Sequence, residues 1–390
     1  MERLGTVTAQ FGFDLFKELS KAHSGNILFS PVSISTAIGM LLLGARGATA
    51  TQLQQVFSSK KDTGSSRVNA EGEELESAEE IHHQLQMVLT EISKLTVNYE
   101  LKLANRLFGE KTYLFLQKYI DYVEKYYHAS LEPVDFINAA DESQKKINSW
   151  VESQTHEKIR DLFPDATLSS STKLVLVSLV HFKGQWDMEF ERERTKEEAF
   201  WLDKDTSKPV LMMIQRQSFS FTPLKDLPAR ILGIPYKNKD LGMFLLLPDD
   251  IDGLEKIIDQ VTPEDLVEWT GPGKMEARTL TLHLPRFEVE GSYDLEAGLA
   301  AMGMADAFRE RRADYSGMSS RPGLYAQNFL HRSFLVVTEE GTEAAAATGV
   351  GYMVTSAPGH DTFHCNHPFL FFIRHNESDS VLFFGRFSSP

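Results

Sequence analysis

The chain of 390 residues contains a single cysteine, Cys365, and therefore cannot form an intrachain disulfide bond. This excludes the small disulfide-rich scaffolds that are common among secreted proteins. Basic residues are also scarce, because 40 Lys and Arg face 55 Asp and Glu, which gives a formal net charge of −15. Without a positive surplus to neutralise phosphates, we expect neither nucleic acid nor an anionic membrane surface as a partner.

The N-terminus lacks a basic flank followed by an apolar run of signal-peptide length. The stretch 22–45 carries no charged residue and is long enough to span a membrane, but serine, threonine and asparagine interrupt it. We interpret its second half as a helix buried in a soluble core, with Pro31 in the first helical turn. With one thiol and no signal peptide, the sequence predicts a protein of the cytoplasm or the nucleus.

Enzyme motifs are missing as well, since the chain has no His-Glu-x-x-His, no Gly-x-Ser-x-Gly and no phosphate-binding loop. Four residues near the C-terminus could be read as metal ligands: His360, His364, Cys365 and His367. Alternate residues of a short strand point to opposite faces, so these four cannot all converge. We therefore expect no metal, no cofactor and no enzymatic activity, and we interpret Cys365 as a buried, unreactive thiol.

Helical patterns dominate the first half of the chain and strand patterns the second, which predicts an α+β fold. Val7, Phe11, Leu15 and Leu19 share one face of a helix. The aliphatic run 174–180 predicts a strand buried on both faces, and 231–236 with 242–247 predict a hairpin. The polar, Glu-rich stretch 58–80 predicts a mobile surface loop between helices. Length alone favours two or three domains.

One segment, 338–359, departs from the globular pattern. No Asp, Glu, Lys or Arg occurs between Glu343 and Asp361, and the segment contains four consecutive alanines and several glycines. Composition alone fits a flexible connecting loop. As a strand, the segment would place an uncharged set of residues on one face and Glu343 on the other. That set is Thr342, Ala344, Ala346, Thr348, Val350, Tyr352 and Val354. Such a face could enter a sheet without burying a charge.

Several separate motifs resemble landmarks of the serpin family, and they occur in the family's order. They are NILFSPVSI at 26–34, FKGQW at 182–186, LPRF at 284–287, GTEAAAAT at 341–348 and FHCNHPFLFFI at 363–373. The likeness runs from about residue 6 to the C-terminus and points to the intracellular, ovalbumin-like branch. It implies a single domain over 1–390, with three β-sheets, eight to nine helices and an exposed reactive-centre loop at about 341–358.

The resemblance implies a suicide-substrate protease inhibitor. A target protease attacks the loop and forms a covalent acyl-enzyme, and the cut loop then inserts into the central sheet before hydrolysis finishes. The residues that match the hinge of inhibitory serpins are Gly341, Thr342, Glu343, Ala344, Ala345, Ala346, Ala347 and Thr348. The inserting face carries no bulky or charged residue in this hinge, which favours an inhibitor over a non-inhibitory serpin acting as a binding or chaperone-like protein.

The implied partner is a target protease in a covalent complex with a monomeric inhibitor that is prone to polymerise. Heparin activation is not expected, because the helical segment 81–95 carries a single lysine, beside one glutamate. Hinge spacing places the reactive bond at Thr355–Ser356, within one residue, preceded by the specificity residues Val354, Met353 and Tyr352. Thr355 suits neither a trypsin-like nor a chymotrypsin-like primary pocket, whereas Val354 suits the apolar second pocket of papain-like proteases. We expect a cysteine protease of the cathepsin L or K type as the target, with a serine protease as the alternative.

Two supporting clusters follow from the same motifs. The shutter cluster, beneath the central sheet where strands must part, comprises Ser30, Ser33, Ser178 and His331. Family members usually carry Asn at the position of Ser178, so we expect Ser178→Asn to raise the thermal midpoint. The breach cluster, at the top of that sheet, comprises Trp186, Arg286 and Glu339. The alternative interpretation of the Arg286–Glu339 pair is an exposed contact that contributes less than about 1 kcal/mol.

Overall fold

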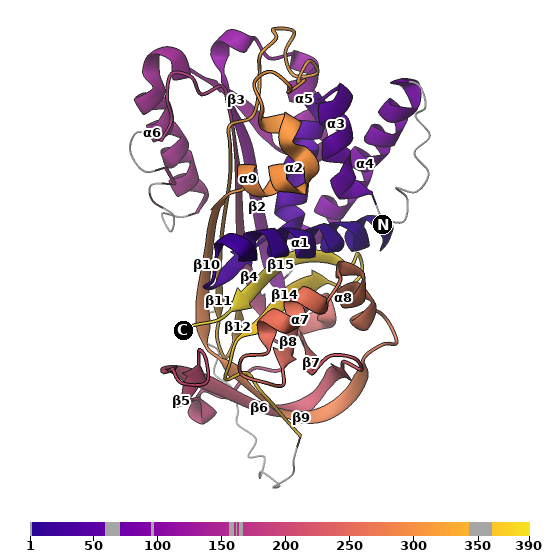
Figure 1. Ribbon diagram of the computed structural model, residues 1–390, viewed down its shortest axis with the longest axis vertical. Helices are drawn as coiled ribbons and strands as arrows, with labels where there is room; N and C mark the ends of the chain where they lie inside the picture. Colours follow the sequence, from indigo (N-terminus) through magenta and orange to yellow (C-terminus); the bar gives the residue numbers. More distant parts are fainter. Residues whose placement is uncertain are drawn as a thin grey trace.

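The computed structural model describes residues 2–58, 71–94, 97–155, 160, 162–163, 167–342 and 361–390. Within these residues the chain forms nine α-helices and fifteen strands (Figure 1). The helices are α1 (Glu2–Ala22), α2 (Pro31–Gly44), α3 (Gly47–Gln54), α4 (Glu71–Ile92), α5 (Gln117–Tyr127), α6 (Phe136–Gln154), α7 (Leu254–Gln260), α8 (Pro263–Trp269) and α9 (Glu296–Leu299). The predicted α+β fold is confirmed.

The strands pair into two sheets within the described residues. The six-stranded sheet has the order β10 (Phe287–Asp294), β11 (Asn328–Val337), β12 (Gly341–Thr342), β4 (Leu174–Gln185), β2 (Tyr99–Glu110) and β3 (Ser130–Val134). The nine-stranded sheet has the order β1 (Ile27–Phe29), β15 (Ser380–Phe387), β14 (Phe369–His375), β8 (Leu241–Pro248), β7 (Ala229–Pro235), β6 (Ser207–Pro223), β9 (Glu276–Pro285) and β13 (Thr362–His364), with β5 (Lys196–Trp201) paired to β6. The long strand β6 pairs with both β7 and β9, so the second and third of the expected sheets are joined by continuous hydrogen bonding.

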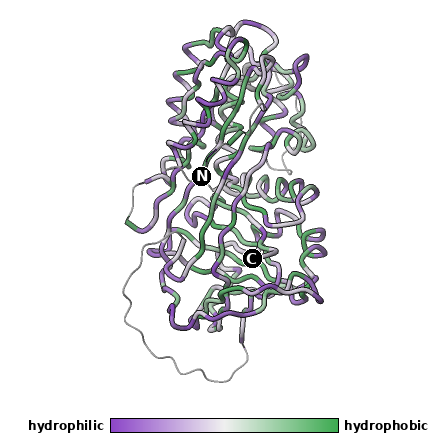
Figure 2. Tube along the Cα trace, turned by 90° about the vertical axis from the view of Figure 1, so that its left-hand side faces the viewer, coloured by the Kyte–Doolittle hydropathy of each residue, from purple (hydrophilic) through white to green (hydrophobic). Residues whose placement is uncertain are grey.

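Figure 1 shows helices α2–α5 gathered at one end of the molecule and strands β5, β6 and β9 at the other, with α7 and α8 beside the nine-stranded sheet. Figure 2 shows hydrophobic residues concentrated along the central strands. Strand β4 has an apolar layer on each side. Leu174, Leu176 and Val180 face the main core, whereas Val175, Val177 and Leu179 face a second core beside α6. This explains why the sequence of β4 is nearly continuous in aliphatic residues.

Several local predictions are confirmed. Helix α1 buries Val7, Phe11, Leu15 and Leu19 on one face. Helix α2 begins at Pro31, where the Ser30 side chain caps it by accepting a hydrogen bond from the Ser33 backbone N–H at 3.2 Å. Strands β7 and β8 form the predicted antiparallel hairpin. None of the helices in the described residues combines the length and the apolar character that a membrane crossing requires.

The predicted loop over 58–80 is wrong from residue 71 onwards, because α4 begins at Glu71. The sequence of its first turns is rich in glutamate, which forms helices readily, and negative charge near a helix N-terminus is favourable. Polarity alone predicts a loop for this stretch, whereas the helix propensity of its residues favours the observed helix. Residues 59–70 lie outside the described residues.

Candidate functional site

The strands β4 and β11 are joined at one end and separated at the other. They pair directly in parallel over six residue pairs, from Val175 with Asn328 to Val180 with Ser333. Beyond this stretch the short strand β12 lies between them and pairs antiparallel with both. The segment that the sequence predicts to insert into a sheet follows directly after β12. The central sheet is therefore already open by one strand at this end.

A glycine is required at the start of β12. Gly341 has a φ of +147°, and a Cβ atom there would lie 2.1 Å from the backbone carbonyl oxygen of Gly184. Only glycine tolerates this combination of conformation and close approach. Thr342 is fully buried, and its hydroxyl lies 3.0 Å from the Tyr236 hydroxyl. These contacts fix where the predicted hinge enters the sheet.

The four predicted shutter residues meet where β4 and β11 pair directly. The Ser30 backbone N–H donates to His331 Nε2 at 2.9 Å, so the other ring nitrogen carries the proton and donates to Ser178 Oγ at 3.0 Å. Ser178 Oγ lies 2.7 Å from Ser33 Oγ, which in turn donates to Asn105 Oδ1 at 3.3 Å. One chain of hydrogen bonds thus crosses β11, β4 and β2 beneath α2.

The shutter cluster is neutral at physiological pH. Burial lowers the pKa of His331 to about 3, because the charged imidazolium would lose its hydration. Asn105 was missed by the sequence analysis. It lies opposite Ser178 in the register of β2 and β4, a pairing between distant parts of the sequence that no local pattern indicates. Its amide supplies to this cluster the group that residue 178 lacks.

The breach cluster is charged, and its carboxylate is fully buried. The Arg286 guanidinium donates two hydrogen bonds to the Glu339 carboxylate, one of them from Nε to Oε2 at 3.1 Å, and the Thr195 hydroxyl donates to Oε1 at 2.9 Å. Burial alone would raise the pKa of Glu339, but the hydrogen bonds from Arg286 and Thr195 hold this pKa below its ordinary value. The interpretation of the pair as an exposed contact is wrong, because the Glu339 side chain is 0% exposed.

Trp186 holds the turn between β11 and β12. Its indole Nε1–H donates to the Thr338 carbonyl at 2.9 Å, and its backbone N–H donates to the Glu340 carbonyl at 3.0 Å. The indole stacks on the Tyr236 ring with the centroids 4.6 Å apart. Tyr236 was not predicted as a site residue, since its role depends on an isolated bridge with Trp186 between the two sheets. Trp186 and Tyr236 thus contact the chain on both sides of Gly341, where the hinge begins.

The remaining predicted loop residues lie outside the described residues. They are the hinge residues Glu343, Ala344, Ala345, Ala346, Ala347 and Thr348, the specificity residues Tyr352, Met353 and Val354, and the reactive bond Thr355–Ser356. His360 also lies outside them.

The other three candidate metal ligands near the C-terminus do not converge. Cys365 is buried in the core, and burial raises the pKa of its thiol well above the ordinary value. His367 Nε2 pairs with the Pro248 carbonyl at 2.7 Å, whereas His364 points to Glu198 on another strand.

Known proteins share this architecture over the whole chain. The family model described as Serpin (serine protease inhibitor) matches residues 6–390. Human Serpin B13 is 73% identical over 391 residues, with both chains covered completely. The crystal structure of uncleaved ovalbumin superposes with a TM-score of 0.87 at 35% identity, covering 99% of this chain and 100% of ovalbumin. A loop-inserted structure of a cleaved ovalbumin mutant superposes with a TM-score of 0.84 at 34% identity, covering 99% and 100%.

These relatives agree with the family assignment from the sequence motifs. The reactive-loop sequence itself resembles that of headpin (also called hurpin), and the similarity to Serpin B13, a headpin-like serpin, agrees with this resemblance. Serpins as a family are protease inhibitors rather than catalytic enzymes, and they form complexes with their target proteases. The chain belongs to the serpin family, in its ovalbumin-like clade B branch.

Proposed function

We propose that this serpin is a suicide-substrate inhibitor whose reactive-centre loop inserts between β4 and β11 after cleavage. The observation that carries the proposal is the position of β12, which already separates these strands at the end where the loop leaves the sheet. Below it, the two strands pair directly over six residue pairs and would have to part. The loop-inserted ovalbumin structure supports such a parting in a related fold.

The chemistry belongs to the target protease. Its nucleophile attacks the carbonyl carbon of Thr355 and forms an acyl-enzyme there. The bond to the Ser356 nitrogen breaks, and this nitrogen takes up the proton lost by the nucleophile and leaves as the free amino group of Ser356. The segment 341–355 has 15 residues and spans about 50 Å when extended at ~3.3 Å per residue. Complete insertion would therefore carry the attached protease along the length of the sheet before water hydrolyses the ester or thioester.

The target that we propose is a papain-like cysteine protease of the cathepsin L or K type. Val354 suits the apolar second pocket by which such proteases select substrates, while Thr355 suits neither a cation-selective nor an aromatic-selective primary pocket. A serine protease is the second candidate, and the description of the matching family model as serine protease inhibitor favours it. A non-inhibitory binding function is the third.

The experiment incubates the full chain with cathepsin L, cathepsin K and a chymotrypsin-like serine protease, and resolves the products on a denaturing gel. We expect a complex stable to denaturant with the cathepsins and, by mass spectrometry, cleavage at Thr355–Ser356. Simple digestion of the loop by both cathepsins would refute the cysteine-protease target. No complex with any protease, together with an unchanged melting temperature after loop cleavage, would refute inhibition itself.

A further inference from the structure

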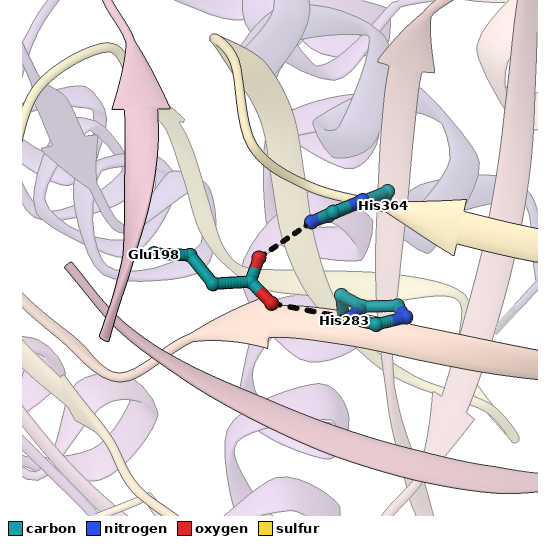
Figure 3. A group of neighbouring side chains, drawn as sticks. All are labelled: Glu198, His283 and His364. Atoms are coloured by element: carbon teal, nitrogen blue, oxygen red, sulfur yellow. Dashed lines mark hydrogen bonds and ion pairs between the residues drawn. The ribbon is translucent and has the colours of Figure 1, made fainter. Parts of the chain in front are cut away.

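Three metal-ligating side chains from distant parts of the sequence meet on the nine-stranded sheet (Figure 3). Glu198 lies on β5, His283 on β9 and His364 on β13, and the two histidines are opposite each other in the parallel pairing of β9 with β13. Their rings stack with the centroids 4.3 Å apart. The Glu198 carboxylate faces both rings, with Oε2 2.7 Å from His364 Nε2 and Oε1 3.9 Å from His283 Nδ1.

The second of these contacts leaves a nitrogen unsatisfied. His283 Nδ1 is shielded from solvent and has no hydrogen-bond partner among the described residues. A separation of 3.9 Å from Glu198 Oε1 is too long for a hydrogen bond. Zinc binds imidazole nitrogen and carboxylate oxygen at about 2.0–2.2 Å, so two such ligand atoms on one tetrahedral ion lie about 3.4 Å apart. The 3.9 Å pair would have to approach by about 0.5 Å to bind one ion. An ion between the Glu198 carboxylate and the two rings would therefore give His283 Nδ1 the partner that it lacks.

One carboxylate faces the cluster, and the basic side chains of Arg194 and Lys196 lie near it. An imidazole binds a metal ion through its neutral form, which offers a nitrogen lone pair. Glu198 supplies one negative charge. Lys196 Nζ lies 3.7 Å from Glu198 Oε1, but its side chain is 63% exposed and can turn to solvent. The His364 side chain is 38% exposed, so water can reach the site as a further ligand.

We propose that Glu198, His283 and His364 form a binding site for a divalent transition-metal ion of the zinc class. Two imidazoles and one carboxylate are a ligand set that zinc takes in catalytic and open sites, where a water completes the tetrahedron. All three ligand atoms lie within 4.8 Å of one another, so small side-chain rotations suffice to close the site. A second group, Glu91, His375 and Glu377, is a poorer candidate, because His375 Nδ1 is already engaged with Ser378 Oγ at 2.8 Å.

The ion would tie down the strand that follows the reactive-centre loop. Strand β13 has three residues, stands at the edge of the nine-stranded sheet and pairs only with β9 in the described part of the chain. Bridging His364 to Glu198 and His283 would link β13 to both β5 and β9. The metal would therefore fix the strand that follows the loop in sequence, and this role does not depend on which protease is the target.

The test is a calorimetric titration of the full chain, stripped of metal with a chelator, with zinc chloride at pH 7.5. We expect one ion per chain, and at least tenfold weaker binding in each of Glu198→Gln, His283→Gln and His364→Gln. His83→Gln, which changes an exposed histidine on α4, is the matched control and should bind as the unchanged chain does. At a hundredfold excess of zinc over Kd, the thermal midpoint of the unchanged chain should rise by about 3 °C.

Absence of binding, or equal binding by the unchanged chain and all three variants, would overturn the proposal. Cobalt(II) provides a readout on the unchanged chain should a variant fail to fold. An absorption spectrum of four-coordinate cobalt with nitrogen and oxygen ligands is expected. A thiolate charge-transfer band would instead assign the ion to Cys365 and would also overturn the proposal.

Discussion

The breach and shutter clusters hold the same two strands, β4 and β11, by opposite means. In the breach cluster, a fully buried carboxylate is paired with Arg286, which is one-third exposed. In the shutter cluster, hydroxyl groups and a neutral imidazole form a chain without any charge. Deleting one partner of a buried ion pair leaves an uncompensated charge, whereas deleting one hydroxyl costs about one hydrogen bond. A substitution in the breach cluster, where the loop would enter the sheet, should therefore cost more stability than one in the shutter cluster, in the middle of the β4–β11 pair.

The largest expected effect is on the stoichiometry of inhibition, and it comes from placing a charge on the face of the loop that would insert between β4 and β11. Ala346 shares the strand face of the buried Thr342, so Ala346→Arg would bury a lone cation during insertion. If the proposed insertion is right, complex formation should give way to turnover as a substrate, with the stoichiometry of inhibition rising at least about tenfold. Ala357→Arg, after the proposed reactive bond, is the control and should leave the stoichiometry unchanged. Equal behaviour of the two variants would contradict insertion.

The next effect tests the breach cluster directly. Glu339→Gln should lower the free energy of unfolding by about 2 kcal/mol, because the fully buried carboxylate that accepts hydrogen bonds from Arg286 and Thr195 becomes a neutral amide with a buried NH2 group. The matched control is Glu290→Gln on β10, which removes an ion pair with Arg332 in which the Glu290 side chain is 50% exposed. That change should cost less than about 1 kcal/mol. Urea denaturation at pH 7.5 measures both, and equal losses would mean that burial of Glu339 does not matter.

Acid should weaken the shutter cluster. The pKa of His331 is about 3 in the folded chain against an ordinary value of 6.5, so between these values the unfolded chain binds a proton that the folded chain does not. Stability therefore falls as the pH falls through this window, by about 2 kcal/mol at pH 5. Comparing the unchanged chain with His331→Gln at pH 7.5 and 5 isolates this contribution, since buried His82 titrates equally in both. Identical losses on acidification would contradict the assignment.

The smallest expected change in stability comes from adding a second amide to the shutter cluster. From the sequence we expect Ser178→Asn to raise the thermal midpoint, but Asn105 already supplies an amide there and Ser178 is fully buried. The structure therefore reverses the expectation: the single change should overpack the site and cost at least about 1 kcal/mol. The paired exchange Ser178→Asn with Asn105→Ser moves the amide without adding one, and should recover the midpoint. A higher midpoint for the single variant would restore the original hypothesis.

Local patterns were sufficient for elements whose burial follows from a short stretch of sequence. The helical stripe from Val7 to Leu19 and the aliphatic run of β4 are of this kind, and the family motifs supplied the shutter and breach residues. Sequence patterns could not predict side-chain contacts that depend on how distant strands align with each other. Asn105 meets Ser178 only because β2 and β4 pair in one register. Glu198 and His364 meet across 166 positions of sequence, so the spacing of His364, Cys365 and His367 gave no sign of their contact.

The direction of the strands around β12 has a consequence for the energetics of the whole sheet. Strands β4 and β11 form one parallel ladder, while β12 runs antiparallel to each of them. A chain continuing from Thr342 between them would exchange that single ladder of slanted bonds for two antiparallel ladders, which are slightly more stable per residue. The additional backbone hydrogen bonds would then favour the inserted state, against the conformational entropy lost when the loop is ordered. The arrangement described here would persist because the exchange is slow, so its lifetime would be set by a barrier rather than by an equilibrium.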